Sequence, residues 1–375
     1  MKSRKFNDNW KEYVLYDLAN WKNGLAFNKI NFSEDGYPII KIAELKNGIT
    51  SQTNFTKDKC SEEVYLRKND LIFSWSGNPE TSIDAYLYDL PEGYLNQHSF
   101  KVTPHEFINK YFLFYVLKYL KPIFKKIASN KQTTGLGHIT ISDLKNLRIK
   151  IPTMEIQERF LKIIKRIDEK ININNQTNDN LYKIIKTQYD KFINDIKEYE
   201  LVKLKDIANV SSGKRPKIKG NEFDIPLIGA SGVMAYTDNY NFNEDILIIG
   251  RVGTLGVVQR YFDKIWASDN TLTIKTEYSS VMECYLKTVD YISLNRGSTQ
   301  PLITQTDISN LEMKFNKMEF MKFENEIKPL RNKIYQNELQ NETLEQLRDI
   351  LLPKLMNGEI DLDKIEIWSY KLLFV

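Results

Sequence analysis

The densest group of cations in the sequence lies in a short segment bounded by glycines. The segment Gly213-Lys-Arg-Pro-Lys-Ile-Lys-Gly220 follows a predicted strand, and its cations are Lys214, Arg215, Lys217 and Lys219. Cations at this density are typical of loops that contact phosphate oxygens, and a solvated surface loop is the alternative. The matching segment in the first half of the chain carries less charge, and its candidates for the same role are Lys22 and Lys29.

Side chains able to read base edges follow predicted strands. Arg251 comes after the apolar run Ile246–Ile249 and before a glycine-rich turn, where it can present its forked guanidinium to guanine. A salt bridge at the strand end is the alternative. Trp75 stands near the matching place in the first half, where it could stack on a sugar or be buried. Polar loops before the last strand of each half add further candidates, with turn capping as the alternative: Gln132, Thr133, Thr134, His138, Thr299 and Gln300.

The sequence shows no recognisable catalytic constellation. A P-loop lysine motif is absent. Asn78-Pro79 continues as Glu-Thr, which is not the Pro-Pro-aromatic sequence expected of an amino-methyltransferase. Cys60 and Cys284 lie far apart, and the three histidines stand away from cysteines or paired carboxylates at ligand spacing. We therefore expect no catalytic residue, no metal site and no cofactor in this chain.

Composition is that of a folded protein with more than one domain. The chain has 375 residues, of which 42% are hydrophobic and 27% charged. Its net charge of +4 only hints at a polyanionic partner, so local patches must carry that argument. The first ten residues lack an apolar signal core, and the most apolar stretch, Tyr111–Leu117, is too short to cross a bilayer. We expect a cytoplasmic protein that makes no membrane contact.

The two halves of the chain repeat each other. Residues 13–20 align with 202–209, sharing Leu, Asp, Ala and Asn, and Thr140–Leu147 aligns with Thr304–Leu311. Short apolar runs of strand type lie between these matches in both halves. Such self-similarity predicts two domains with one common fold.

A helical segment with a heptad pattern follows each predicted domain. In the first segment, seam residues recur at alternating steps of four and three from Ile167 to Phe192. Both segments carry two asparagines at the same seam positions: Asn174, Asn178, Asn337 and Asn341. Buried asparagines weaken a coiled coil but select its register, so we expect these four to pair between antiparallel helices. Two unrelated amphipathic helices are the alternative.

These patterns predict an α+β fold with a pseudo-twofold internal repeat. Two mixed α/β domains, 1–152 and 198–316, are joined by two long antiparallel coiled-coil helices, 153–197 and 317–360, and a tail follows at 361–375. A helix of about 40 residues is about 60 Å long. The helix pair would therefore act as a spacer between two domains.

Three motifs make the chain resemble the specificity (S) subunit of a type I restriction-modification enzyme along nearly all of its length. The sequence Leu351-Leu-Pro-Lys-Leu-Met-Asn-Gly-Glu-Ile360 is similar to the family's ending of its second helix. Gly297-Ser-Thr-Gln300 with Thr304–Leu311 is similar to the close of a recognition domain, and Pro226–Gly232 with Ile249–Gly256 to its middle. The first domain departs from this pattern, with Ser74-Trp-Ser-Gly77 where the second has Gly250-Arg-Val-Gly253.

The resemblance implies a DNA-reading subunit rather than an enzyme. Each target-recognition domain would read one half of a split, asymmetric site in double-stranded DNA, and the helices would set the gap between the halves. Two methyltransferase (M) subunits would dock on the helices, with restriction (R) subunits in the full complex. S-adenosylmethionine, ATP and Mg would then belong to those partners. The alternatives are a specificity subunit of a system other than type I, and a two-domain coiled-coil scaffold that binds no DNA.

Overall fold

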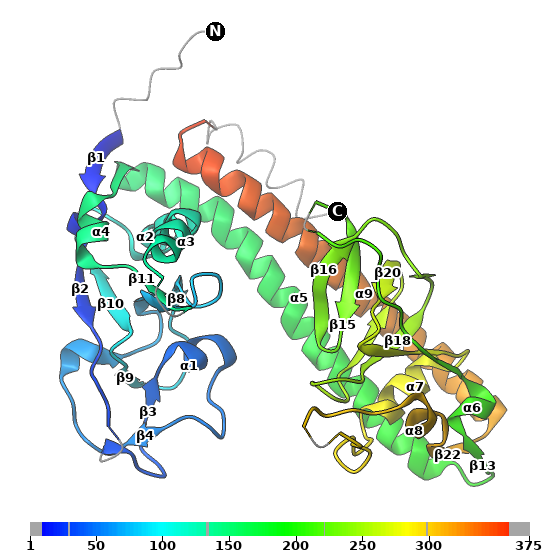
Figure 1. The fold of residues 1–375 in the computed structure, drawn as a ribbon. Helices are drawn as coiled ribbons and strands as arrows, with labels where there is room; N and C mark the ends of the chain where they lie inside the picture. The colour runs from blue at the N-terminus through cyan, green and yellow to red at the C-terminus, as the bar shows by residue number, and fades with distance from the viewer. Residues whose placement is uncertain (1–9, 29–30, 133–134, 221, 298, 360–375) are drawn as a thin grey trace. The chain divides into compact units, whose positions relative to one another are not determined.

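The computed structural model describes residues 10–28, 31–132, 135–220, 222–297 and 299–359, and it divides into two compact units. Unit 1 comprises residues 1–172 and 341–375, and unit 2 comprises residues 173–340. The division falls inside both long helices rather than at their ends. Each unit therefore contains one sheet-bearing domain together with a stretch of each helix (Figure 1).

Unit 1 is closed by its first and last strands, β1 (Trp10–Val14) and β12 (Arg148–Pro152), which pair antiparallel. One four-stranded sheet has the order β2 (Ala19–Asn23), β10 (Ser99–Pro104), β6 (Leu71–Ser74) and β8 (Asp84–Leu87). The other has the order β4 (Phe55–Thr56), β3 (Tyr37–Ile40), β9 (Gly93–Leu95) and β5 (Tyr65–Leu66). A two-stranded pair joins β7 (Ser76–Gly77) to β11 (Gly137–His138). The helices are α1 (Ile42–Asn47), α2 (Lys110–Tyr119), α3 (Lys121–Asn130) and α4 (Ile141–Asn146), with 3-10 turns at Leu15–Leu18 and Glu62–Val64.

Unit 2 is built in the same way. Its first and last strands, β13 (Glu200–Lys203) and β22 (Glu312–Phe315), pair antiparallel. The sheets have the orders β14 (Asn209–Ser212), β21 (Thr271–Lys275), β18 (Ile246–Gly250), β19 (Val258–Tyr261), and β16 (Gly232–Thr237), β15 (Ile225–Gly229), β20 (Lys264–Ala267), β17 (Phe242–Asn243). The short helices are α6 (Leu204–Ile207), α7 (Ser279–Leu286) and α8 (Gln305–Ser309).

The strand orders of the two units correspond one to one, which confirms the predicted α+β fold with an internal repeat. In each unit the second sheet contains one parallel pair, β3 with β9 and β15 with β20, among antiparallel neighbours. Each unit also has a capping box at the N-terminus of its last short helix. Thr140 and Asp143 form this box in unit 1, and Thr304 and Asp307 form it in unit 2.

The long helices α5 (Met154–Asp195) and α9 (Lys317–Met356) run antiparallel and complete the core of each unit. In unit 1, Leu352, Leu355 and Met356 from the end of α9 are buried in the cluster that contains the aromatic residues of α2. In unit 2, Tyr189 of α5 and Phe320 of α9 are buried with the sheet residues. The larger core cluster of each unit therefore includes residues of both long helices, whereas a smaller cluster in each unit contains none.

Polar and apolar pairs alternate along the predicted helix seam. In unit 1, Ile167 and Ile171 pack against Leu344. In unit 2, Asn337 Nδ2 donates to Asn178 Oδ1 at 2.7 Å, and Asn178 Nδ2 donates to the Ile334 carbonyl at 3.4 Å. These amide bonds satisfy groups that are almost fully buried.

The remaining seam asparagines are also buried. Asn174 Nδ2 donates to Gln340 Oε1 at 2.9 Å, and Asn341 is 9% exposed. The regular heptad ends before Gln188, which is exposed, whereas Tyr189 is buried. At this point α5 packs on the core of unit 2, so its buried face follows that core. Within the described residues, no helix is long and apolar enough to cross a membrane.

The Asn178–Asn337 bond predicts that a double substitution is less destabilising than a single one. Asn337→Leu should destabilise the chain by about 1–3 kcal/mol, because Asn178 Oδ1 keeps its burial and loses its donor. Replacing both asparagines with leucine should raise the melting temperature above that of the single variant while allowing other helix registers. Thermal unfolding and light scattering measure the two effects, and Asn180→Leu on the exposed side of α5 is the control. A double variant less stable than the single one would contradict this account.

Candidate nucleic-acid interface

The basic loop, residues 213–220, has a fixed backbone and free side chains. Gly213 N donates to the Thr271 carbonyl at 3.0 Å, and Lys214 N donates to the Ala267 carbonyl at 2.9 Å. At its other end, Gly220 N donates to the Tyr236 carbonyl at 3.0 Å, so the loop crosses from β20 to the edge strand β16. The side chains of Lys214, Arg215, Lys217 and Lys219 are exposed, and none forms an ion pair with another described residue.

Glycine is required where this loop begins. A Cβ atom on Gly213 would lie 2.0 Å from the Ser268 carbonyl oxygen and 2.7 Å from Thr271 Oγ1. Gly24 holds the same place in unit 1, where a Cβ atom would lie 2.1 Å from the Asn96 carbonyl oxygen. Both glycines therefore let a loop pass directly against the neighbouring strand.

Arg251 connects three segments of unit 2 at the start of the basic loop. Its N–H donates to the Asn270 carbonyl at 3.0 Å, and its carbonyl accepts from Ile303 N at 3.0 Å. Its side chain donates from Nη1 to Ser212 Oγ at 3.2 Å, while its buried Nε has no partner among the described residues. The predicted alternative, a salt bridge at the strand end, does not occur among the described residues. One edge of the guanidinium is thus held in place beside the basic loop.

Residues 299–302 of the polar loop lie against the glycine-rich turn that follows Arg251. Gly253 N donates to the Pro301 carbonyl at 3.0 Å, and a Cβ atom on Gly253 would lie 3.9 Å from Gln300 Nε2. Thr299 and Gln300 are exposed. The side chain of Arg296 holds the start of this loop by an ion pair to Asp307 in the capping box of α8. Arg251 therefore lies between Ser212, which precedes the basic loop, and the glycine-rich turn that contacts Gln300.

Trp75 occupies in unit 1 the position that Arg251 occupies in unit 2. Its N–H donates to the His98 carbonyl at 3.3 Å, and its carbonyl accepts from Ile139 N at 2.8 Å. Its side chain donates from Nε1 to Asn23 Oδ1 at 2.9 Å, just before Gly24. The indole is half-buried and packs on Phe100, with 5.8 Å between the ring centroids. The same backbone frame therefore presents an indole in one unit and a guanidinium in the other.

The other predicted residues of unit 1 are less concentrated. His138 is exposed on β11 and pairs with Ser76, the neighbour of Trp75, and Gln132 is exposed just after α3. The ammonium of Lys131 lies 2.6 Å from both carboxylate oxygens of Asp143. Arg296 forms the corresponding ion pair with Asp307 in unit 2. Lys22 lies on β2 and pairs with Glu63 at 2.5 Å, so its charge is partly neutralised. Lys29, Thr133 and Thr134 lie outside the described residues.

Sequence reasoning missed the partners that hold Arg251 and Trp75. Ser212 and Asn23 each directly precede the glycine that begins the loop of their unit. That shared position in the repeat was the available signal. Their chemical types differ, so composition alone could not have revealed them.

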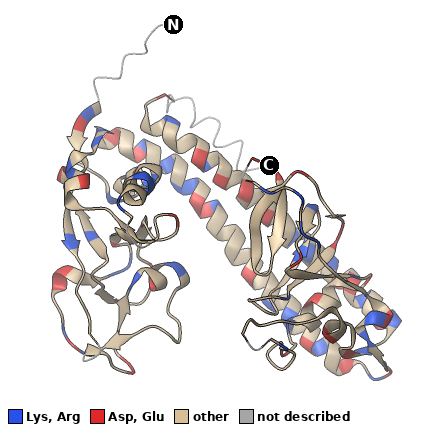
Figure 2. Cartoon of the chain, in the orientation of Figure 1, with Lys and Arg blue, Asp and Glu red and all other residues tan. Residues whose placement is uncertain are grey.

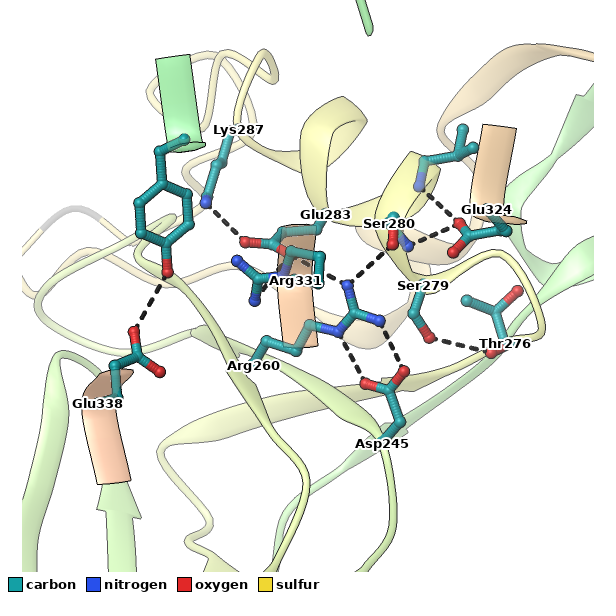
Figure 3. Close-up of polar contacts among 12 residues, drawn as sticks. Asp245, Arg260, Thr276, Ser279, Ser280, Glu283, Lys287, Glu324, Arg331 and Glu338 are labelled. Atoms are coloured by element: carbon teal, nitrogen blue, oxygen red, sulfur yellow. Dashed lines mark hydrogen bonds and ion pairs between the residues drawn. The ribbon is translucent and has the colours of Figure 1, made fainter. Parts of the chain in front are cut away.

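A buried charge cluster fastens the sheet of unit 2 to α9 (Figure 3). Arg260 of β19 forms two bonds to Asp245, at 2.7 and 2.8 Å. The carboxylate of Glu283 on α7 lies 3.3 Å from Arg260, 3.2 Å from Arg331 of α9 and 2.7 Å from Lys287. Burial opposes ionisation of Glu283, but the three cations outweigh burial and hold its pKa below the ordinary value.

A second carboxylate of α9 reaches the start of α7. One oxygen of Glu324 accepts from Ser280 N at 2.7 Å and from Val281 N at 2.8 Å. Burial raises the pKa of Glu324 despite these bonds. Together the two carboxylates hold β19, α7 and α9 in fixed relative positions, so the loops of this sheet keep a fixed orientation on the helix.

In unit 1, fewer charged side chains join the sheet-bearing domain to the long helices. Gln157 of α5 accepts from Asn109 N at 2.8 Å and donates to the carbonyls of Phe107 and Pro152 at 3.1 and 2.9 Å. Asp168 of α5 accepts from the Tyr115 hydroxyl and lies 3.0 Å from Arg348 Nη1. Burial and this carboxylate both raise the pKa of Tyr115.

Charges elsewhere on the helices are mixed in sign. Figure 2 shows Lys and Arg interleaved with Asp and Glu along α5 and α9. Among the described residues, no group of three or more His, Cys, Asp or Glu side chains could hold a metal ion. The basic loop therefore carries exposed cations that form no ion pair with described residues, whereas positive and negative side chains are mixed along the helices.

Comparisons with known proteins point to one family. The family model for the type I restriction modification DNA specificity domain matches the chain twice, at residues 7–183 and 196–322. The chain is 28% identical over 198 residues to the type I restriction enzyme MjaVIII specificity subunit of Methanocaldococcus jannaschii, covering 48% of this chain and 44% of that protein. It is 26% identical over 200 residues to the type I restriction enzyme HindI specificity subunit of Haemophilus influenzae, covering 50% and 41%. The chain spans about half the length of the curated relatives it matches.

The fold is also found among solved structures. The S subunit of a type I restriction-modification system from M. genitalium matches with a TM-score of 0.59 and 18% identity. The match covers 95% of this chain and 98% of that one. At this identity the match shows that the two chains share a fold.

The charge cluster predicts acid sensitivity in unit 2. Arg260→Met should destabilise it by about 3–5 kcal/mol, because Asp245 and Glu283 lose a cation with which they pair. The contribution of Glu283 should be complete above the ordinary glutamate pKa of 4.5 and be lost as the pH falls through the lower pKa of the folded state. Thermal unfolding from about pH 3 to pH 7 checks both effects, and Glu283→Gln should flatten the acid slope.

The matched control for this experiment is Lys275→Met. Lys275 pairs with Glu244 in the same unit, but both side chains are largely exposed. Its loss should cost less than about 1 kcal/mol. Equal effects of the two substitutions would contradict the role assigned to burial.

Proposed function

The chain belongs to the family of type I restriction modification DNA specificity domains, and on this premise we propose that it is the sequence-reading subunit of a DNA modification system. Each unit reads one half of a split, asymmetric target in double-stranded DNA. The helices α5 and α9 set the distance between the halves. The chain itself performs no chemistry on the DNA.

The observation that carries the proposal is the basic loop of unit 2. Its backbone is tied to β20 and β16, while its four cations are exposed and have no ion-pair partner among the described residues. Fixed cations suit phosphate oxygens, which set the register of a protein on a duplex without reading sequence. Arg251 is bonded to Ser212 at the start of this loop, and Gln300 lies beside the turn that follows Arg251. Their side chains carry the groups that pair with guanine and adenine edges.

The difference between the units fits an asymmetric target. In unit 1 the matching frame presents Trp75, and His138 pairs with the neighbouring Ser76. Gln132 is exposed after α3, and Lys22 shares its charge with Glu63. An indole favours stacking and sugar contact, whereas a guanidinium favours hydrogen bonds to bases. We assign the DNA-contacting role in unit 1 to these residues, together with Lys29, Thr133 and Thr134.

Partners supply the chemistry in this proposal. Two M subunits bind along the helices and use S-adenosylmethionine to methylate the target, and R subunits use ATP and Mg in the full complex. The complex acts in the cytoplasm, where its DNA is. The seam asparagines Asn174, Asn178, Asn337 and Asn341 fix the helix register and hence the gap between the half-sites.

Neutralising the basic loop tests DNA binding directly. Lys214→Ala/Arg215→Ala and Lys217→Ala/Lys219→Ala should each weaken binding to all duplexes and lower the slope of log affinity against log salt by about 0.9 for each phosphate that is no longer neutralised. The measurement is a salt titration of DNA binding by the complex with its methyltransferase partner. Lys197→Ala/Lys205→Ala removes two exposed cations elsewhere in unit 2 and is the charge-matched control. Unchanged slopes in both loop variants would favour a scaffold that binds no DNA.

Substitutions at the shared frame should change one half-site at a time. Arg251→Ala should relax the sequence required in the half read by unit 2, because removing a bidentate bond to a base costs about 1–3 kcal/mol of discrimination. Trp75→Ala should affect only the other half. Base-resolution mapping of adenine methylation by the complex measures both half-sites in one experiment. Changes spread over both halves for either variant would contradict a separate reading by each unit.

A further inference from the structure

A second feature of unit 2 lies beside the basic loop and is not explained by the fold. Five large apolar side chains between residues 218 and 240 are exposed: Ile218, Val233, Met234, Tyr236 and Tyr240. Val233 and Met234 lie on the edge strand β16 and are each 51% exposed. Neighbouring exposed apolar side chains such as Val233 and Met234 usually mark a contact surface.

A β-bulge directs Met234 out of the sheet. In the pairing of β15 with β16, Leu227 faces Ala235 and Ile228 faces Val233, so Met234 is the extra residue. Bulges of this kind re-aim a side chain at a sheet edge. The sulfur of Met234 lies over Gly229, where a Cβ atom would come within 3.1 Å of it. Glycine at this position therefore makes room for the methionine side chain.

The tip of this hairpin is fixed next to Arg251. Gln259 Nε2 donates to the Gly229 carbonyl at 3.1 Å. A Cβ atom on Gly250, the residue before Arg251, would lie 2.4 Å from the Ala230 carbonyl oxygen. The hairpin that carries Val233 and Met234 therefore packs against Gly250, the residue before the proposed base-reading Arg251.

Unit 1 shows that the fold does not need this extension. Its matching edge strand, β4, has two residues, and Ser33 N donates to the Phe55 carbonyl at 2.9 Å as Gly220 N does to Tyr236. In both units, a loop thus covers the edge strand. In unit 2 the edge strand continues beyond this cover with two exposed apolar side chains, whereas the described edge strand β4 of unit 1 ends after two residues.

We propose that Val233 and Met234 form an apolar contact with base edges in the DNA groove, beside the phosphates held by the basic loop. The occupant is DNA rather than a protein, because the adjacent cations have no ion-pair partner among the described residues and suit a polyanion. Apolar side chains can touch a thymine methyl group or press between base steps. This contact adds sequence discrimination to the half-site read by unit 2. The inference rests on the proposed DNA-reading function.

The test compares target and non-target duplexes in the complex with the methyltransferase partner. Val233→Ser/Met234→Ser should weaken target binding about tenfold, as expected when an apolar surface of this size no longer meets the DNA. Its affinity for a non-target duplex and its salt slope should match those of the native protein, since no charge changes. Leu201→Ser, at a residue 69% exposed on β13, is the matched control and should alter neither affinity. Equal melting temperatures would show that all variants are folded.

Two outcomes separate this inference from the proposed function. If the serine variant binds its target within about twofold of the native protein while Lys217→Ala/Lys219→Ala still loses affinity, the apolar contact is wrong and DNA reading stands. If the lysine variant also binds like the native protein, both fail. A parallel loss of target and non-target affinity in the serine variant would show a contact that carries no sequence information and would overturn the inference.

Discussion

The hydrogen-bonded ladder between the first and last strand of each unit is the constraint on which the rest of the structure depends. β1 pairs with β12, and β13 pairs with β22, so each unit begins and ends at the same place. The next residues repeat this closure, since Leu15 N donates to Leu147 O and Leu204 N donates to Leu311 O, both at 2.9 Å. A long helix begins directly after each ladder. The two long helices therefore begin at equivalent positions of the two units.

The sequence could predict the features that depend on spacing. The repeat, the two long helices and the seam from Ile167 to Ile185 all follow from periodic patterns. The structure buries the positions of that seam except Leu181, which is partly buried. The seam prediction is wrong at Gln188, which is exposed. At this point Tyr189 is buried instead, because it packs on a core built from residues far along the chain. The buried Arg331 of α9, which pairs with Glu283, is a feature that no local sequence pattern predicts. Periodicity predicts which face of a helix is buried, but not what lies against it.

Part of the candidate site follows from the sequence and remains a prediction. The density of charge identified the basic loop, and the repeat aligned Arg251 with Trp75. The two residues make matching backbone hydrogen bonds in their units. The bulge at Met234 could not be predicted, because it depends on how β15 and β16 align. A one-residue shift in strand pairing leaves no mark in composition.

The shared frame also separates stability from recognition. Backbone groups make most of its bonds, so the side chain at position 75 or 251 contributes one tether and is otherwise free to differ. An indole and a guanidinium fit the same frame. The scaffold therefore tolerates changes in the chemistry that it presents to a ligand.

The division of the chain into units sets an order of maturation during synthesis. Unit 2 is one continuous stretch, 173–340, whereas the core of unit 1 needs Leu352, Leu355 and Met356 from the end of α9. Translation proceeds from the N-terminus, so the domain made first lacks part of its core until the end of α9 has left the ribosome. Until then the part of the core that these three residues complete stays open. A nascent chain of this protein thus completes its second domain before its first.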